Sequence, residues 1–134
     1  MTDSRNKQTV LEYVDAFNHA DMETLRRLHT EDAVIRGVLG WGGLNEVMPI
    51  WQMLHDVFAV SMHVDSIIEE GDIVAVRYTE RGTSVGPFRG QEPTGKSYEI
   101  VAIEWFEMKE GLIHRRWGAR DSGAQQRQMG LAPL

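Results

Sequence analysis

The sequence contains no cysteine, which excludes several kinds of chemistry at once. Without thiols the chain can form no disulfide, has no thiolate nucleophile and lacks thiolate ligands for a metal. The histidines show no metal-binding pattern either, because none belongs to an H-E-x-x-H pattern or to a close pair. We therefore expect no metal site among them: His19, His29, His55, His63 and His114.

The sequence also lacks an excess of positive charge and any long hydrophobic run. Its 14 Lys and Arg residues stand against 20 Asp and Glu, which gives a net charge of −6 at pH 7. Nucleic-acid-binding domains usually carry a basic face, so we expect no nucleic-acid partner. No apolar run approaches the roughly 20 residues of a membrane-spanning helix, and the first residues, MTDSRNKQ, do not resemble a signal peptide. We expect a cytoplasmic protein without a membrane partner.

The length fits one domain, residues 1–134, in which helices precede strands. Apolar residues recur at helical spacing in two short segments within residues 7–34 and, most clearly, in residues 44–58. From residue 62 the apolar period changes to two, which predicts one hairpin over residues 62–82 and another over residues 97–121. Helices followed by hairpins are typical of an α+β domain with helices on one face of a curved antiparallel sheet.

Two segments give weaker signals. Residues 33–39, AVIRGVL, are predicted to form a short strand. Residues 122–134 show no clear apolar period, and we expect them to wrap over the surface or over a partner subunit.

A two-residue turn at Glu110-Gly111 sets the predicted register of the second hairpin. With that turn Glu104 lies opposite Trp117, and Ile100 lies opposite Asp121. Because successive side chains of a strand alternate between its faces, one face is then mainly apolar but carries two carboxylates. We expect this face to line a pocket, and its predicted members are Ile100, Ala102, Glu104, Phe106, Trp117 and Asp121.

The opposite face of this hairpin is also apolar, with Val101, Ile103 and Trp105 on one strand. A sheet with two apolar faces needs two covers, and the helices can cover only one of them. An uncovered apolar patch of this size is unusual for a monomer. The pattern therefore predicts a homodimer or a higher homo-oligomer that packs through the outer face of the sheet.

Asp121 has two interpretations, which its spacing leaves open. It can be a solvated residue at the end of a strand, where Asp is common. Alternatively, a carboxylate at the rim of an apolar, Trp-lined pocket is desolvated and can remove and return a proton near neutral pH. Removing a proton next to a carbonyl also needs hydrogen-bond donors for the enolate oxygen. The candidate donors are Tyr13, His55, Arg115 and Trp117.

Residues 90–97, GQEPTGKS, match the P-loop pattern G-x-x-x-x-G-K-[ST] at every fixed position. A P-loop follows a buried strand and opens a helix, because loop amides and the helix N-terminus hold the phosphates. Here the preceding residues are broken by Pro87 and by glycines, and the following residues are strand-like. We therefore interpret the segment as a connection between two strands.

Three segments follow one another at characteristic distances: residues 69–96, residues 110–121 and residues 127–130. Together they resemble the SnoaL-like ester cyclase family, the polyketide cyclase branch of the NTF2-like superfamily. That family typically shows G-D-x-V-x-x-R, then G-T-H-x-G-x-F-x-G-x-x-P-T-G-K, then D-G-K-I-x-E-x-W-x-x-x-D, and finally Q-L-G. The matching positions are Gly71, Asp72, Val74, Arg77, Gly82, Thr83, Gly86, Phe88, Gly90, Pro93, Thr94, Gly95, Lys96, Gly111, Ile113, Trp117, Asp121, Gln128 and Gly130.

The resemblance implies a cone-shaped α+β barrel, in which a curved antiparallel sheet surrounds a pocket closed by N-terminal helices. It implies an enzyme that closes a ring by an intramolecular aldol step, without a cofactor, and with Asp121 as the acid/base. It also implies a homo-oligomer packed through the outer face of the sheet. The P-loop match is then explained as a loop sequence of the family.

The sequence departs from the family pattern at Ser84, which stands where the family has His, and near Arg36, which replaces a second His. These changes alter the lining of the pocket. Relatives on the same fold isomerise, hydrate or hydroxylate their substrates, or only bind them. The alternatives to a cyclase are therefore a non-catalytic domain that binds a small ligand, and an isomerase or hydrolase on the same scaffold.

The residues and the resemblance together predict a site for a small hydrophobic molecule, with Asp121 as the catalytic residue. The helix over residues 44–58 contributes Trp51 and His55 on its apolar face. A lone His in such a place is more often a hydrogen-bonded core residue than a ligand contact, so His55 has both interpretations. The predicted substrate-binding residues are Trp117, Tyr13, His55, Trp51, Phe106 and Glu104.

Overall fold

The computed structural model describes residues 4–38 and 40–133, which form a six-stranded sheet and four helices. The helices are α1 (Arg5–Asn18), α2 (Met22–Arg27), α3 (Leu44–Phe58) and α4 (Ser122–Met129). The strands are β1 (His29–Gly37), β2 (Gly40–Gly42), β3 (Ser61–Glu70), β4 (Ile73–Thr83), β5 (Ser97–Lys109) and β6 (Leu112–Arg120). The predicted α+β class is confirmed.

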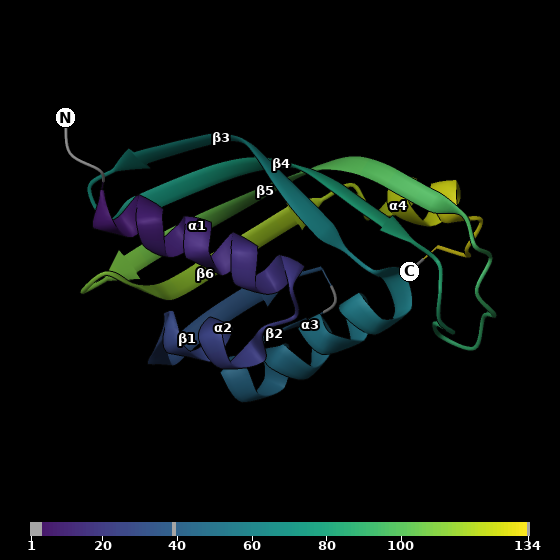
Figure 1. The fold of residues 1–134 in the computed structure, drawn as a ribbon, viewed down its shortest axis with the longest axis horizontal. Coiled ribbons are helices and arrows are strands. Elements are labelled where there is room, and N and C mark those ends of the chain that lie inside the picture. Colours follow the sequence, from purple (N-terminus) through teal and green to yellow (C-terminus); the bar gives the residue numbers. More distant parts are fainter. Residues whose placement is uncertain (1–3, 39, 134) are drawn as a thin grey trace.

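The sheet is strongly curved, and its strands lie in the order β2-β1-β6-β5-β4-β3 (Figure 1). Helices α1, α2 and α3 lie on its concave side, and α4 packs against β5 at the far end. Neighbouring strands are antiparallel except for β1 and β6, which are parallel. The curved sheet with helices on one face is as predicted. The parallel pair departs from the predicted antiparallel sheet, and its two strands are joined through the rest of the chain and not by a hairpin turn.

Local sequence signals explain where the first helices begin. The side chains of Ser4 and Asp21 accept hydrogen bonds from the amides of Lys7 and Thr24, which caps α1 and α2. Helices α1 and α3 each bury one face at helical spacing. These two faces pack onto the concave side of the sheet and build the core with Val10, Tyr13, Val14, Phe17, Val47, Trp51 and Phe58.

The C-terminal segment, in which no apolar period is visible, forms helix α4. Asp121 caps its first turn by accepting a hydrogen bond from the amide of Ala124 at 2.9 Å. Gly130 ends the helix in the left-handed conformation, with φ at 72°. The buried face includes Gln125 and Gln126, and these polar residues hide the apolar period.

A β-bulge changes the predicted register of β5 and β6. The turn itself is as predicted, because Lys109 pairs with Leu112. The register then shifts, so that Glu107 pairs with Arg115 and His114 becomes an extra residue of β6. Every later residue of β6 therefore points to the face opposite to the predicted one.

The bulge exchanges the inward and outward residues of β6. Trp117 pairs with Trp105 on the outer face of the sheet, so its predicted place in the pocket is wrong. Arg116 and Arg120 point inward in its stead, on the same face as Glu104. The concave face of the sheet is therefore more strongly charged than the predicted register implies.

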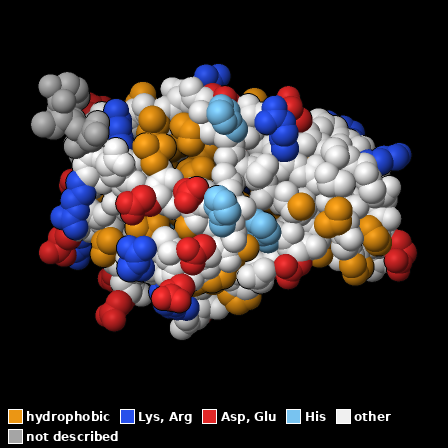
Figure 2. Space-filling view, viewed as in Figure 1, with side chains coloured by type: hydrophobic (Ala, Val, Ile, Leu, Met, Phe, Trp, Pro, Cys, Tyr) orange, Lys and Arg blue, Asp and Glu red, His pale blue; other side chains and the backbone are white. Residues whose placement is uncertain are grey.

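Acidic and basic side chains lie among each other on the face of the molecule seen in Figure 2, and no continuous basic stripe crosses this face. Hydrophobic side chains form small separate groups between them. Within the described parts of the chain, no helix is both long and apolar enough to cross a membrane.

Candidate functional site

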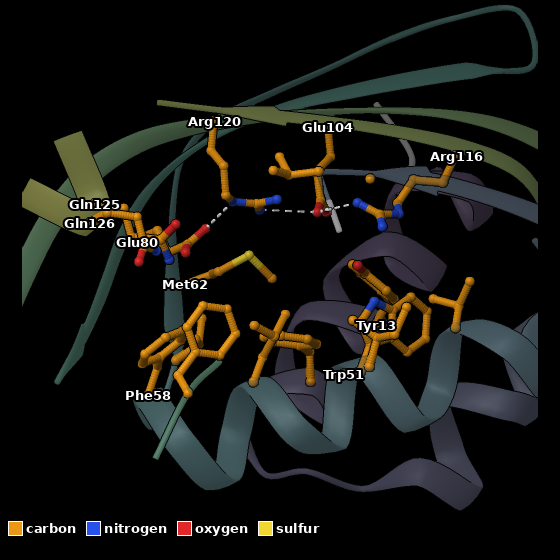
Figure 3. Close-up of a pocket in the computed structure, with 18 residues that line it drawn as sticks. Tyr13, Trp51, Phe58, Met62, Glu80, Glu104, Arg116, Arg120, Gln125 and Gln126 are labelled. Atoms are coloured by element: carbon orange, nitrogen blue, oxygen red, sulfur yellow. Dashed lines mark hydrogen bonds and ion pairs between the residues drawn. The ribbon is translucent and has the colours of Figure 1, made fainter. Parts of the chain in front are cut away.

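A cavity of about 70 Å³ lies between the concave face of the sheet and helices α1 and α3 (Figure 3). This is several times the volume that one water molecule needs. One wall is apolar and comes from α1, α3 and β3, with Tyr13, Phe17, Trp51, Leu54, Phe58 and Met62. The other wall is polar and comes from β4, β5, β6 and α4, with Glu80, Glu104, Arg116, Arg120, Gln125 and Gln126.

Four ionised side chains form a chain of ion pairs along the polar wall. Arg116 Nη1 donates to Glu104 Oε2 at 2.5 Å, and Arg120 Nε donates to Glu80 Oε1 at 2.7 Å. Arg120 Nη2 also lies 3.6 Å from Glu104 Oε2, so Arg120 bridges the two carboxylates. The side chains of Glu80, Glu104 and Arg116 are at most 4% exposed. Charges buried to this extent are tolerated only when they are paired.

Two tyrosine hydroxyls complete the hydrogen bonding of the carboxylates. Tyr78 donates to Glu104 Oε1 at 3.0 Å, and Tyr98 donates to Glu80 Oε2 at 2.6 Å. Burial, followed by the charge of the neighbouring carboxylate, raises the pKa of Tyr78 and of Tyr98 well above the usual value of 10.0. Both hydroxyls therefore keep their protons and remain donors at neutral pH.

The two arginines stay charged inside the protein. Burial by itself would lower the pKa of each guanidinium, but the carboxylates outweigh it and the pKa of Arg116 and of Arg120 is raised. Glu104 is the main cause for Arg116, and Glu80 followed by Glu104 for Arg120. Two guanidiniums thus face two carboxylates, and the polar wall carries no net charge.

Tyr13 stands where the two walls meet. Its ring packs edge-on against Phe106 at 5.3 Å and against Trp51 at 6.0 Å between ring centroids. Burial, followed by the charge of Glu104, raises the pKa of Tyr13 above its usual value, so its hydroxyl is protonated. Figure 3 shows Tyr13 and Trp51 beneath the Glu104–Arg116 pair. A ligand in the cavity therefore meets aromatic rings on one side and hydrogen-bond donors on the other.

The cavity brings together three of the predicted site residues: Tyr13, Trp51 and Glu104. Phe106 is fully buried and packs against the Tyr13 ring, but it does not line the cavity. His55 does not line it either, since its Nε2 lies 3.2 Å from the carbonyl oxygen of Asn18 and its ring packs against α1. His55 therefore fits the interpretation as a hydrogen-bonded packing residue and not the one as a ligand contact.

Asp121 and Trp117 lie outside the cavity lining. Asp121 is exposed, and its Oδ1 is occupied by the amide of Ala124 at the start of α4. Trp117 is turned to the outer face by the bulge in β6. Asp121 is nevertheless adjacent to the cavity in sequence, because Arg120 before it and Gln125 after it are lining residues. Its position fits the solvated strand-end interpretation, and its role in acid/base chemistry stays a prediction.

Sequence reasoning missed most of the polar wall. Arg116 and Arg120 share one parity on β6, but only the bulge at His114 turns that parity inward. Glu80 shares the buried face of β4 with Tyr78, so a carboxylate on the apolar side of a strand was a visible signal. Gln125 and Gln126, the glutamines of α4 that line the cavity, could have been placed only by recognising that helix.

The P-loop-like segment does not have the geometry of a phosphate-binding loop. In the P-loop-like segment the amide of Gly95 donates to the Ser84 carbonyl at 2.9 Å, and that of Thr94 donates to Ser84 Oγ at 3.0 Å. These amides are used within the loop, and the residues that follow enter β5 and not a helix. Among residues 4–38 and 40–133, no three His, Asp or Glu side chains are grouped to hold a metal ion.

The sequence matches the model of one protein family, described as SnoaL-like polyketide cyclase, over residues 7–129. No curated protein matches the sequence. The match runs from the first turn of α1 to the end of α4 and includes all residues of the polar wall.

Several solved structures share the fold. Wild-type IdmH, a proposed polyketide cyclase from Streptomyces antibioticus, has 28% identity and a TM-score of 0.84, over 96% of this chain and 100% of that one. AclR, a proposed hydroxylase from Streptomyces galilaeus, has 24% identity and a TM-score of 0.84, over 96% and 87% of the two chains. A proposed SnoaL-like polyketide cyclase from Jannaschia sp. CCS1 has 21% identity and a TM-score of 0.87, over 99% of both chains.

Proposed function

Because this chain belongs to the SnoaL-like polyketide cyclase family, we propose that it is a small enzyme that closes a ring in a hydrophobic carbonyl compound without a cofactor. Its fold is the cone-shaped α+β barrel of the NTF2-like proteins. The proposed reaction is an intramolecular aldol addition. A base removes a proton from the carbon next to one carbonyl, the enolate carbon bonds to a second carbonyl carbon of the same molecule, and the oxygen there takes up a proton.

The two-walled cavity is the feature that supports this proposal most directly. Its apolar wall, with Phe17, Trp51 and Phe58, suits the hydrocarbon part of a substrate. Its polar wall presents a carboxylate and two guanidiniums to the cavity, and these groups suit the carbonyl end of a substrate. A site with these features can both move a proton and stabilise a developing negative charge on oxygen.

Each role has a candidate in the cavity. Glu104 is the carboxylate nearest the junction of the two walls, and we assign it the transfer of the proton. Arg116 and the protonated hydroxyl of Tyr13 are donors for the enolate oxygen. Trp51 holds the substrate against the polar wall.

Asp121 is the rival candidate for the proton transfer. The family resemblance implies it, whereas its exposed side chain and its bond to α4 favour a capping role. The two assignments differ in a measurable way, because Glu104→Gln and Asp121→Asn each replace a carboxylate by an amide of the same shape.

The test begins with a substrate. Aromatic polyketide esters and small diketones are incubated with the protein, and ring closure is followed by chromatography and mass spectrometry. With a substrate in hand, Glu104→Gln should lower kcat by on the order of 100-fold or more, since an amide cannot accept the proton. Glu99→Gln, which removes a carboxylate from the exposed face of the same strand, should leave kcat unchanged.

Glu104→Gln leaves Arg116 without its partner, so its folding must be checked by circular dichroism. If that variant does not fold, Glu104→Asp serves instead: it keeps the charge but withdraws the carboxylate by one methylene, which should still lower kcat at least about ten-fold. Wild-type kcat in either folded variant would contradict the assignment of Glu104.

The second candidate function is binding without catalysis. Both oxygens of Glu80 and of Glu104 already accept hydrogen bonds from tyrosine or arginine, which favours a rigid wall over a proton-transfer group. Saturable binding of a carbonyl compound, with no product formed by any compound of the screen, would support this function over the enzyme.

A further inference from the structure

Glu80 is a carboxylate of the polar wall to which the proposed reaction gives no role. Glu80 lies on β4 at the end of the cavity near α4, whereas Glu104 and Arg116 lie closer to Trp51 (Figure 3). We propose that Glu80 sets the charge selectivity of the cavity: it neutralises Arg120, so that the cavity takes an uncharged carbonyl compound and rejects a carboxylate. The proposal rests on the proposed function only in taking this cavity as the ligand site.

Arg120 depends on Glu80 for its neutralisation. Its Nε donates to Glu80 Oε1 at 2.7 Å, whereas its Nη2 lies 3.6 Å from Glu104 Oε2. That oxygen of Glu104 already accepts a hydrogen bond from Arg116 at 2.5 Å. If Glu80 lost its charge, one carboxylate would have to serve two guanidiniums. The wall would then carry one surplus positive charge.

Glu80 is also fixed in place. Its second oxygen accepts the hydroxyl of Tyr98 at 2.6 Å, and its side chain is 3% exposed. Donors from β5 and β6 thus hold it from two sides, and it cannot swing away to leave Arg120 to a ligand. A carboxylate that entered the cavity would bury a charge for which the wall has no surplus cation, and such burial is costly. A neutral carbonyl oxygen needs no counter-charge and can still accept a hydrogen bond from a guanidinium.

The net charge of −6 also repels anions at a distance. The effect of the charge pairing in the cavity must therefore be distinguished from the effect of the net charge. Glu99 provides the control. It lies on β5, as Glu104 does, but on the outer face, where it pairs with Arg81 and is 62% exposed. Glu99→Gln and Glu80→Gln remove the same charge from the chain, and only Glu80→Gln removes it from the cavity.

Acetophenone and benzoate are suitable probes, because they have nearly the same shape and only benzoate is charged at neutral pH. Dissociation constants are measured by NMR titration of the full chain. Wild-type protein should bind acetophenone at least about ten-fold more tightly than benzoate. Glu80→Gln should bind benzoate at least about ten-fold more tightly than the wild type does, and acetophenone within about three-fold of it. Glu99→Gln should match the wild type for both probes.

Arg120→Gln is the reciprocal variant, and it keeps the proposal testable if Glu80→Gln does not fold. It leaves the wall with one surplus negative charge. It should therefore gain affinity for 1-phenylethylammonium, the cation with the shape of acetophenone, by at least about ten-fold over the wild type.

Several results would overturn the proposal. Benzoate could bind the wild type as tightly as acetophenone does, the folded variants could lack the gains that match their charge, or Glu99→Gln could reproduce them. Failure of every probe to shift cavity resonances at millimolar concentration would overturn it as well. The test needs no turnover: a protein that converts no carbonyl compound can still show the charge selectivity, and an active enzyme can lack it.

Discussion

Trp105 and Trp117 lie directly opposite each other on β5 and β6, and both point away from the cavity to the outer face of the sheet. They are 47% and 38% exposed. These two residues belong to a row of paired residues that runs across the sheet. Arg36 pairs with Trp117, and Trp41 pairs with Arg36. On the other side Ala75 pairs with Trp105. Directly paired residues present their side chains on one face, so three of the four tryptophans form one exposed row.

This row predicts self-association through the outer face. Val101 and Ile103 flank it and are more than half exposed, which makes a broad apolar surface. Trp105→Glu places a charge in the middle of that surface and should convert a wild-type dimer into monomers or aggregates. Light scattering at micromolar concentration measures the result.

Val85→Glu is the matched control for this prediction. Val85 is an exposed apolar residue in the connection between β4 and β5, away from the tryptophan row. The same charge introduced there should leave the oligomeric state unchanged. A monomeric wild-type protein at micromolar concentration would show that the outer face is not an interface.

Gly118 is needed for the ion pair between Glu104 and Arg116. It pairs with Glu104 across β5 and β6, and a Cβ at this position would overlap Arg116 Nη1. Because Arg116 is buried, it has little room to move aside. Gly118→Ala should therefore displace the guanidinium and lower the free energy of unfolding by about 1–3 kcal/mol, as measured by urea denaturation.

Gly123→Ala tests whether this effect is local. Gly123 lies in the first turn of α4, where a Cβ would approach the flexible end of Arg127. Alanine favours a helix over glycine by up to about 1 kcal/mol, so this variant should be neutral or stabilised. Equal stability of Gly118→Ala and the wild type would contradict the steric explanation.

His29 is buried as a neutral imidazole. Its Nδ1 lies 2.6 Å from the Leu25 carbonyl, to which it donates, and its ring packs against Tyr13 and Trp51. Within the described residues its Nε2 has no hydrogen-bond partner. Burial lowers the pKa of His29 from 6.5 to about 4, so the folded protein resists protonation at this site.

This pKa predicts a loss of stability in mild acid. Between pH 6.5 and about 4 the unfolded chain binds a proton that the folded chain does not, so the free energy of unfolding falls as the pH falls. The loss from His29 should approach about 3 kcal/mol over that window. His29→Gln keeps a donor for the Leu25 carbonyl and removes the titration. Its free energy of unfolding, measured at pH 7 and pH 5, should change less than that of the wild type, and an equal change would count against the buried imidazole as the cause.

The fold was predictable because its elements carry strong periodic signals, whereas the site depended on one irregularity. The helix with Trp51, the hairpins and the Glu110-Gly111 turn all follow from apolar spacing and turn chemistry. The bulge at His114 has no comparable signal, since one extra residue in a strand leaves the apolar pattern readable in either register. That single residue moved Trp117 out of the predicted pocket and brought Arg116 in.

Helix α4 was not predicted from the sequence for a different reason. Its capping signals are present in the sequence, with Asp121 before the first turn and Gly130 after the last. They carry little weight without an apolar period, and the buried face of this helix includes glutamines. The sequence alone therefore does not identify Asp121 as the N-cap of a helix.

Asp121 provides the last prediction, because its two interpretations give opposite results. Its Oδ1 caps α4 by accepting the amide of Ala124 at 2.9 Å, and the side chain is exposed. Asn caps a helix about as well as Asp, so Asp121→Asn should change the free energy of unfolding by less than about 0.5 kcal/mol. Asp121→Ala removes the cap and should cost about 1 kcal/mol.

The kcat of Asp121→Asn distinguishes the two interpretations of Asp121. If Glu104 transfers the proton, Asp121→Asn should keep kcat within about three-fold of the wild type, because the asparagine retains the capping bond and the carboxylate is not needed. If Asp121 is the acid/base that the family resemblance implies, the same variant should lose on the order of 100-fold in kcat at unchanged stability. The loss would also require the side chain to leave the α4 cap when substrate binds, and Asp121→Ala would then lose activity and stability together. A large loss in Asp121→Asn with full activity in Glu104→Gln would move the acid/base role from the polar wall to Asp121.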